Sequence, residues 1–188
     1  MSVELVAKLK ALKLHGMAQT WPELMAKARH ADIAPEQLLG ELLAAETAER
    51  EVRSIAYQMT AARFPAHRDL AGFRFAESRV DEELIRRLHA GQFMDDAQNL
   101  VFIGGPGTGK THLATAIGIE AIQRQGRRVR FFSTVELVNA LEQEKAAGKA
   151  GRIALRLLRM DLVILDELGY LPFSQAGGAL LFHLLSKL

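Results

Sequence analysis

Cysteine is absent from the sequence, and this absence excludes several classes of protein. Without cysteine the chain forms neither a disulfide scaffold nor a thiolate metal site, and the composition fits a reducing cytosol. No uncharged apolar run approaches the roughly 20 residues that span a bilayer. Residues 1–13 carry three lysines and no apolar centre, unlike a signal peptide. We therefore expect a cytoplasmic protein without a membrane partner.

A strong excess of charge of one sign is also missing. The net charge is +2, which is too small to indicate nucleic-acid binding by itself. Hydrophobic residues make up 49% and charged residues 24%, as in ordinary globular proteins, so a sizeable core is expected. The 188 residues are enough for one domain of usual size or two small ones.

Residues 1–63 predict an all-helical N-terminal domain. The pattern Thr-Trp-Pro-Glu at 20–23 resembles a capping box and predicts a helix start there. A long helix is predicted from Pro35 towards Pro65. One face of this helix carries apolar residues at helical spacing, namely Leu38, Leu42, Ala45, Val52, Ile55 and Met59.

The opposite face of that long helix is expected to be solvated. Glu46 stands four residues before Arg50, and Glu49 stands four residues before Arg53. Pairs in this order stabilise an exposed helix by a few tenths of a kcal/mol each.

Residues 64–80 predict a linker that packs on the next domain, and residues 81–188 predict an α/β domain. The spacing of Ser78 and Asp81 resembles a capping box and predicts a short helix that ends near Gly91. Beyond it, three short apolar strands are predicted in alternation with helices, and this order favours a parallel sheet with right-handed crossovers. The predicted strands are Asn99–Ile103, Val129–Phe132 and Leu162–Leu165, and the predicted helices after the first strand are 112–125, 134–147 and 152–159.

A glycine-rich segment between the first strand and the next helix carries the chemistry. Residues 104–111 match the pattern G-x-x-x-x-G-K-[ST] at every defined position. Glycine lets the backbone approach a phosphate closely and adopt positive φ, so the N–H groups face phosphate oxygens at a helix N-terminus. Lys110 would contact the β- and γ-phosphates, and Thr111 would offer its hydroxyl to Mg²⁺. The predicted ATP-binding residues are Gly104, Gly105, Pro106, Gly107, Thr108, Gly109, Lys110, Thr111 and His112.

Two acids follow the third predicted strand. Asp166 and Glu167 stand at its carboxyl end, the edge where ligands bind in open α/β sheets. Asp166 is expected to hold Mg²⁺, and Glu167, with Lys110, is expected to act in hydrolysis by polarising the attacking water. An acid in this position is often only a cap on the next turn, and the upstream loop favours the catalytic interpretation.

Two groups of arginines permit two interpretations each. The first group, at 124–130, either faces DNA or forms a solvated basic turn at a helix end. The second group consists of Arg152, Arg156 and Arg159 on one helical face, and either follows DNA or contacts another subunit.

With these residues in hand, the sequence resembles the IstB-type ATP-binding proteins, helper ATPases of bacterial insertion sequences related to the helicase loader DnaC. The similarity covers LKLHGMAQTW near the start, NLVFIGGPGTGKTHLATAIGIEA in the middle and the final DLVILDELGYLPFSQAGGALLFHLLSKL. It implies a P-loop NTPase fold of the AAA+ type with ATP and Mg²⁺ as cofactors. It further implies that the helical domain of residues 1–63 contacts DNA or a partner protein. It also implies ATP-dependent homo-oligomers in the bacterial cytoplasm that assemble on double-stranded DNA and direct a cognate transposase.

The relatives in this resemblance continue beyond the position of Leu188, into further strands, a sensor residue and an arginine for the neighbouring ATP. The sequence therefore predicts a C-terminally truncated product, an incomplete sheet in which the first and third strands pair directly, and impaired hydrolysis. Two alternatives stay open: a DnaC-like replicative helicase loader, and a fragment that binds nucleotide or DNA without ATP turnover.

Overall fold

The computed structural model describes residues 2–29, 33–169 and 174–188. The chain divides into two compact units, Met1–Ala56 and Tyr57–Leu188, called here the helical unit and the α/β unit. Among the described residues, no helix combines the length and apolarity that a membrane span requires. Tyr170, part of the segment that resembles the IstB-type proteins, lies outside the described residues.

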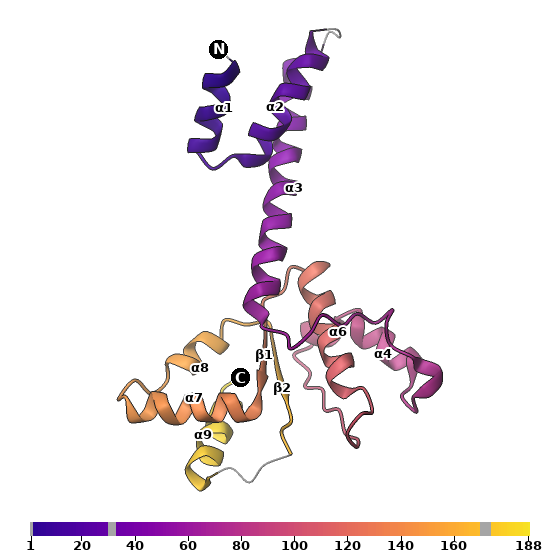
Figure 1. The fold of residues 1–188 in the computed structure, drawn as a ribbon, viewed down its shortest axis with the longest axis vertical. Helices are drawn as coiled ribbons and strands as arrows, with labels where there is room; N and C mark the ends of the chain where they lie inside the picture. The colour runs from indigo at the N-terminus through magenta and orange to yellow at the C-terminus, as the bar shows by residue number, and fades with distance from the viewer. Residues whose placement is uncertain (1, 30–32, 170–173) are drawn as a thin grey trace. The chain divides into compact units, whose positions relative to one another are not determined.

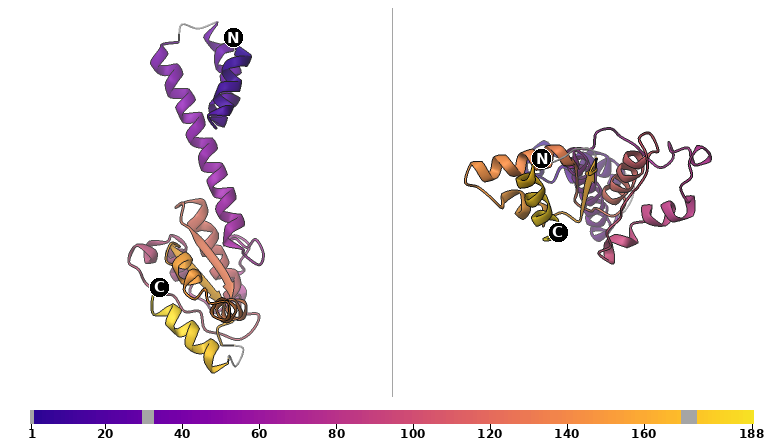
Figure 2. Two further views of the ribbon diagram at one scale, coloured as in Figure 1. Left: turned by 90° about the vertical axis from the view of Figure 1, so that its left-hand side faces the viewer. Right: turned by 90° about the horizontal axis from the view of Figure 1, so that it is seen from below.

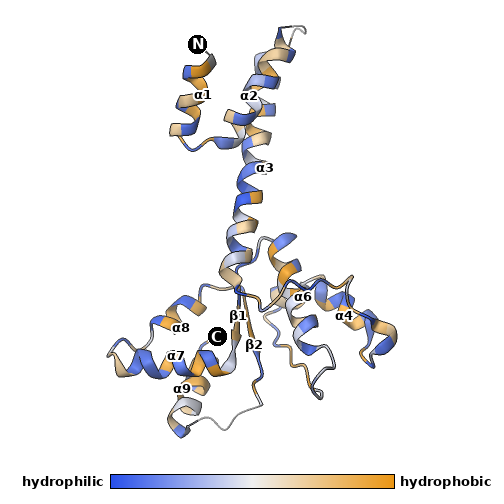
Figure 3. Ribbon diagram, in the orientation of Figure 1, coloured by the Kyte–Doolittle hydropathy of each residue, from blue (hydrophilic) through white to orange (hydrophobic). Residues whose placement is uncertain are grey.

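The helical unit contains α1 (Ser2–Ala11), α2 (His15–Ala28) and the first part of α3 (Pro35–Ala62). Helix α3 confirms the long helix predicted from Pro35. Its middle, drawn blue in Figure 3, is rich in charged residues because the sequence there reads ETAEREVR. Helices α1 and α2 pack against each other.

The predicted start of α2 at residues 20–23 is wrong, because the helix begins at His15 and runs through Pro22. Its N-cap residue, Leu14, makes no side-chain capping hydrogen bond. The cap comes instead from α3, where the Glu46 carboxylate accepts hydrogen bonds from Gly16 N at 2.9 Å and Met17 N at 3.4 Å. A carboxylate at a helix N-terminus satisfies free N–H groups and complements the helix dipole. A local sequence pattern cannot reveal a cap supplied from another helix.

The two faces of α3 also differ from the prediction at two positions. Glu46 does pair with Arg50, at a distance of 2.7 Å. However, Glu46 is only 5% exposed, so it does not lie on a solvated face of α3. Val52, expected on the apolar face, is 63% exposed. The predicted pair Glu49–Arg53 is present at 3.2 Å.

The described part of the α/β unit consists of helices around two strands. Its elements follow in the order η1 (Phe75–Glu77), α4 (Glu82–His89), α5 (Gln92–Asp95), α6 (Lys110–Gln123), β1 (Val129–Ser133), α7 (Thr134–Ala146), α8 (Arg152–Leu157), β2 (Leu162–Asp166) and α9 (Gln175–Leu185). Helix α4 is capped by Asp81, whose carboxylate accepts from Leu84 N at 3.1 Å. Ser78 does not cap it, since its hydroxyl accepts from Val80 N.

The sheet is parallel, as predicted, but it has two strands among the described residues. Strand β1 pairs with β2 from Val129↔Leu162 to Ser133↔Asp166. Side chains alternate between the two faces of a strand. Helix α6 lies on one side of this sheet, and α7, α8 and α9 lie on the other (Figures 1 and 2). Ile164 faces α6 beside Gly118, and Val163 and Leu165 pack against the buried residues of α7, α8 and α9.

The strand predicted at Asn99–Ile103 is wrong, since these residues form neither strand nor helix. Val101 is 77% exposed and Ile103 is 92% exposed. A strand needs a neighbouring segment that pairs with its backbone, and an apolar run alone predicts burial rather than a partner. The expected direct pairing between this segment and residues 162–165 is also wrong, because β2 pairs with β1 alone among the described strands.

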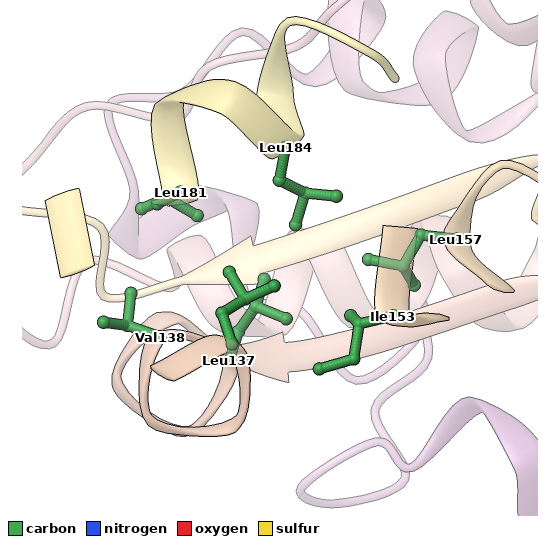
Figure 4. Packing of buried hydrophobic residues seen from close by; sticks show 7 residues of the cluster. Leu137, Val138, Ile153, Leu157, Leu181 and Leu184 are labelled. Carbon is green, nitrogen blue, oxygen red and sulfur yellow. The ribbon is translucent and has the colours of Figure 1, made fainter. Parts of the chain in front are cut away.

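A hydrophobic core lies on the α7–α9 side of the sheet. Figure 4 shows Leu181 and Leu184 of α9 directed towards the side chains of α7 and α8. Burial of each such side chain contributes about 1.5–3 kcal/mol relative to exposure. The buried members of this cluster are Leu137, Val138, Leu141, Ile153, Leu157, Leu181 and Leu184.

Candidate nucleotide-binding site

The glycine-rich loop leads directly into α6. Its last glycine, Gly109, is the N-cap of α6 with φ +87°, and Gly107 has φ +74°. Both conformations favour glycine because they are left-handed. Gly104, Gly105 and the exposed Pro106 precede this turn. The N-terminus of the 14-residue helix α6 therefore opens onto an exposed loop, an arrangement that suits an anion.

The loop folds around its own lysine and threonine side chains. Lys110 Nζ donates to the carbonyl oxygens of Gly104 at 2.8 Å and Gly105 at 2.7 Å. The Thr108 hydroxyl donates to Gly105 O at 2.8 Å. The ammonium group thus lies against the backbone of the glycine-rich loop.

Thr111 and Asp166 meet although 55 residues separate them in the sequence. The Thr111 hydroxyl donates to Asp166 Oδ2 at 2.7 Å. Hydroxyl and carboxylate oxygens are hard ligands of the kind that Mg²⁺ prefers. The structure therefore brings together the two residues that the sequence assigned to Mg²⁺.

The position of Asp166 depends on a residue that the sequence analysis missed. Thr134 is fully buried at the start of α7, and its hydroxyl donates to the backbone oxygen of Asp166 at 2.6 Å. Because Thr134 follows β1 and Asp166 ends β2, this bond ties together the carboxyl ends of both strands. A hydroxyl residue two positions after the predicted strand Val129–Phe132 is the signal that could have found it.

Glu167 lies at the edge of this site with an unusual backbone. Its φ is +62°, which is uncommon for a residue other than glycine, and its N–H donates to Asp166 Oδ1 at 3.0 Å. Its side chain is exposed. Such conformations store strain and cluster at functional sites.

Residues 69–73 pack against Gly109 of the glycine-rich loop and against His112, a contact that the sequence did not predict in detail. A Cβ on Gly109 would lie 2.5 Å from the Phe73 ring, so glycine is required here for close packing as well as for φ. His112 Nε2 lies 2.7 Å from the Asp69 carbonyl oxygen, and its ring meets Phe73 edge-on at 5.3 Å. His112, one of the predicted ATP-binding residues, therefore contacts the segment of residues 69–73.

The arginines at 124–130 divide into two kinds. Arg124 pairs with Glu120, Arg127 with Asp95 and Arg128 with Asp161, and these ion pairs favour the solvated basic turn over a DNA contact. Hydrogen bonds from Arg128 lower the pKa of Asp161 below its usual value, although partial burial acts in the opposite direction. Arg130 has no such carboxylate partner among the described ion pairs.

A glycine-rich loop that opens a helix, beside a carboxylate at the end of a parallel strand, is the arrangement of P-loop nucleotide-binding proteins. The family comparison agrees with this class. The chain belongs to the family described as IstB-like ATP binding protein, whose model matches residues 7–188. Family membership implies a P-loop NTPase fold.

Individual relatives are similar over nearly the whole chain. A protein of Geobacillus stearothermophilus, named for ATP binding in insertion sequence IS5376, is 34% identical over 177 residues, or 94% of this chain and 70% of the relative. The corresponding IS21 protein of Pseudomonas aeruginosa is 30% identical over 185 residues, which cover 98% of this chain and 69% of that protein. An IS21-like protein of Bacteroides fragilis is 26% identical over 184 residues, 97% of this chain and 70% of its own length.

Proposed function

We propose that this protein is an ATP-binding helper of insertion-sequence transposition, of the AAA+ type, that assembles on double-stranded DNA and assists a transposase. The observation that carries the proposal is the Thr111–Asp166 hydrogen bond beside the glycine-rich loop. It joins two candidate Mg²⁺ ligands at the N-terminus of α6, where the triphosphate of ATP would be held. The names of the relatives from insertion sequences support the transposition role.

The residues of this site divide the work of nucleotide binding among them. The N–H groups of residues 104–109 and the N-terminus of α6 would hold the phosphates, and Lys110 would leave the carbonyls of Gly104 and Gly105 to neutralise them. Thr111 and Asp166 would hold Mg²⁺, which supplies charge neutralisation to the phosphates when bound. Glu167 would orient the attacking water and accept its proton.

Direct binding of a fluorescent ATP analogue, with and without Mg²⁺, tests this proposal. Lys110→Ala removes a charge-assisted contact worth about 1.5–3 kcal/mol, so we expect roughly 10- to 100-fold weaker binding. Lys27→Ala, a matched loss of charge on α2, should leave the affinity unchanged. Equal affinity of the Lys110→Ala and unmutated proteins would refute the site.

Turnover and the partners are tested separately. Glu167→Gln should retain binding of the analogue and lose phosphate release, because the amide does not accept the proton of water. Pull-down of a transposase, rather than a replicative helicase, by the ATP-bound protein would support the transposition role. Capture of the helicase alone would favour a helicase loader instead.

A further inference from the structure

Arg63, Arg130 and Arg156, called here the arginine cluster, belong to separate elements of the α/β unit. The Arg130 guanidinium lies against the end of α3, because its Nη1 donates to the carbonyl oxygen of Ala61, two residues before Arg63. Arg130 is the second residue of β1, Arg63 directly follows α3, and Arg156 lies on α8. Burial, together with the positive charges of Arg63 and Arg156, lowers the pKa of Arg130 below its usual value. Arg63 and Arg156 are exposed, so the cluster opens to solvent.

The central guanidinium of this cluster is held in place. Arg130 lies over the Phe132 ring, 4.9 Å from its centroid, and Nη1 donates to the carbonyl oxygen of Ala61. A guanidinium group carries five N–H donors, so most of them remain available to a further acceptor. A fixed orientation reduces the entropy lost when a planar anion binds.

No carboxylate neutralises this cluster within the described part of the chain. The ion pairs of the described residues include Arg124, Arg127 and Arg128, but none of them includes Arg63, Arg130 or Arg156. Folding therefore brings three like charges together without internal compensation. A group of three cations without a carboxylate partner favours the binding of a polyanion from outside the protein.

The basic surface continues from Arg156 along an open groove between α7 and α8. The groove has a volume of about 660 Å³, and its lining includes Lys149, Arg152 and Arg156. Its one acid, Glu144, accepts hydrogen bonds from Gly151 N at 3.1 Å and from Ile153 N at 2.8 Å. Since three cationic side chains line the groove with this single carboxylate, the lining keeps a net positive charge.

We propose that Arg63, Arg130 and Arg156 bind phosphates of a double-stranded DNA backbone, and that Lys149 and Arg152 extend this contact along the groove. The choice of DNA rests on the proposed function, and the placement rests on the structure. A single carboxylate from another subunit would neutralise one of these charges, whereas successive phosphates can neutralise all of them. Contacts of this kind fix the protein on the duplex without reading its sequence.

The test measures the affinity of the full chain for fluorescein-labelled duplexes of two unrelated sequences over a series of salt concentrations. The double variant Arg63→Gln/Arg156→Gln changes two exposed residues and should weaken binding equally for both duplexes. The slope of log K against log salt should fall in magnitude by about 0.9 for each lost phosphate contact. Arg79→Gln/Arg87→Gln, a matched pair of exposed arginines outside the cluster, should leave affinity and slope unchanged.

Arg130→Lys gives a third variant that retains the charge and removes the planar fork, and it should weaken binding less than Arg63→Gln/Arg156→Gln. Unchanged affinity and slope in the double variant, or no DNA binding by the unmutated protein, would overturn the proposal. A loss of self-association by light scattering with an unchanged salt slope would also overturn it and would assign the cluster to a subunit contact. Binding of the ATP analogue, measured on the same samples, tests the proposed ATP site separately from the proposed DNA-phosphate surface. If that binding fails while arginine-dependent DNA binding persists, the ATP site is refuted and the phosphate surface stands.

Discussion

At the scale of single residues, Glu46 joins two helices of the helical unit. Burial would raise the pKa of its carboxyl group, but hydrogen bonds from Arg50, Met17 N and Gly16 N outweigh burial and lower the pKa below its usual value of 4.5. A carboxyl group with a lowered pKa in the folded state stabilises that state above its usual pKa. This contribution is lost as the pH falls through the lowered value.

Glu46→Gln should lower the melting temperature of the helical unit at neutral pH, because the amide lacks the charge that holds the N-terminus of α2. The difference from the unmutated protein should begin to shrink near pH 4.5, where the carboxyl group of the unfolded chain becomes protonated, and vanish as the pH falls through the lowered pKa of the folded state. Circular dichroism melts over a pH series measure this. Glu49→Gln is the control, since among the described ion pairs Glu49 contacts Arg53 alone, both side chains are partly exposed, and the change should alter stability little. A constant difference between the Glu46→Gln and unmutated proteins at all pH values would contradict the capping role.

The close packing beside Glu46 gives a second prediction. A Cβ on Gly16 would lie 2.3 Å from the Ala45 carbonyl oxygen, so Gly16→Ala should push α2 away from α3 and cost about 1–3 kcal/mol. Gly40→Ala is the matched control, because no atom lies within 4 Å of its added Cβ. It should stabilise α3 by about 0.5–1 kcal/mol through helix propensity. Urea unfolding followed at Trp21 measures both, and equal effects would show that the packing at Gly16 is not tight.

At the scale of the elements, Thr134 connects the start of α7 to the end of β2. Thr134→Val removes the hydroxyl and leaves the backbone oxygen of Asp166 without this donor, at a cost of about 1–3 kcal/mol. Thr47→Val removes a similar hydroxyl bond, to Leu43 O on the exposed side of α3, and should change stability by less than about 0.5 kcal/mol. Thermal unfolding of the two variants compares them directly. A Thr134→Val protein as stable as the Thr47→Val protein would show that the hydroxyl does not tie these elements together.

The elements also show what the sequence can predict. Long α3, the strands β1 and β2 and the helix that follows the glycine-rich loop were predicted because each depends on a local pattern of apolar and turn residues. The parallel direction of the sheet was predicted from the alternation of strands and helices, but the pairing of β1 with β2 was not. The start of α2 and the state of residues 99–103 were predicted wrongly, because each depends on a distant segment. The start of α2 depends on the cap that Glu46 of α3 supplies. Whether residues 99–103 form a strand depends on a neighbouring segment that pairs with their backbone.

In the candidate site too, features that depend on consecutive residues were predicted, and contacts between distant residues were not. The glycine-rich loop was visible in the sequence because its eight residues are consecutive. The sequence assigned both Thr111 and Asp166 to Mg²⁺ but did not predict the direct hydrogen bond between them, which the structure shows at 2.7 Å. The packing of Phe73 on Gly109 was not foreseen, since no pattern links these two positions.

At the scale of the whole molecule, the two units should respond differently to ligand. The proposed ATP site lies entirely within the α/β unit, Tyr57–Leu188. Ligand that binds only the folded form stabilises it, by about 2.7 kcal/mol at a hundredfold excess over Kd. Hydrogen exchange should therefore slow in α6, β1 and β2 when Mg²⁺ and ATP are added, with no change in α1 and α2. Equal slowing in both units would contradict a site confined to the α/β unit.

The hydrogen bonds between Glu46 and α2 also set an order of events on the ribosome. The chain is made from its N-terminus, so Gly16 leaves the exit tunnel before Glu46, which stands 30 residues later. The first turn of α2 has no cap until α3 has been synthesised far enough to supply one. Nascent chains that pause between these two residues therefore carry a frayed α2, and the native helix pair closes only after Glu46 emerges.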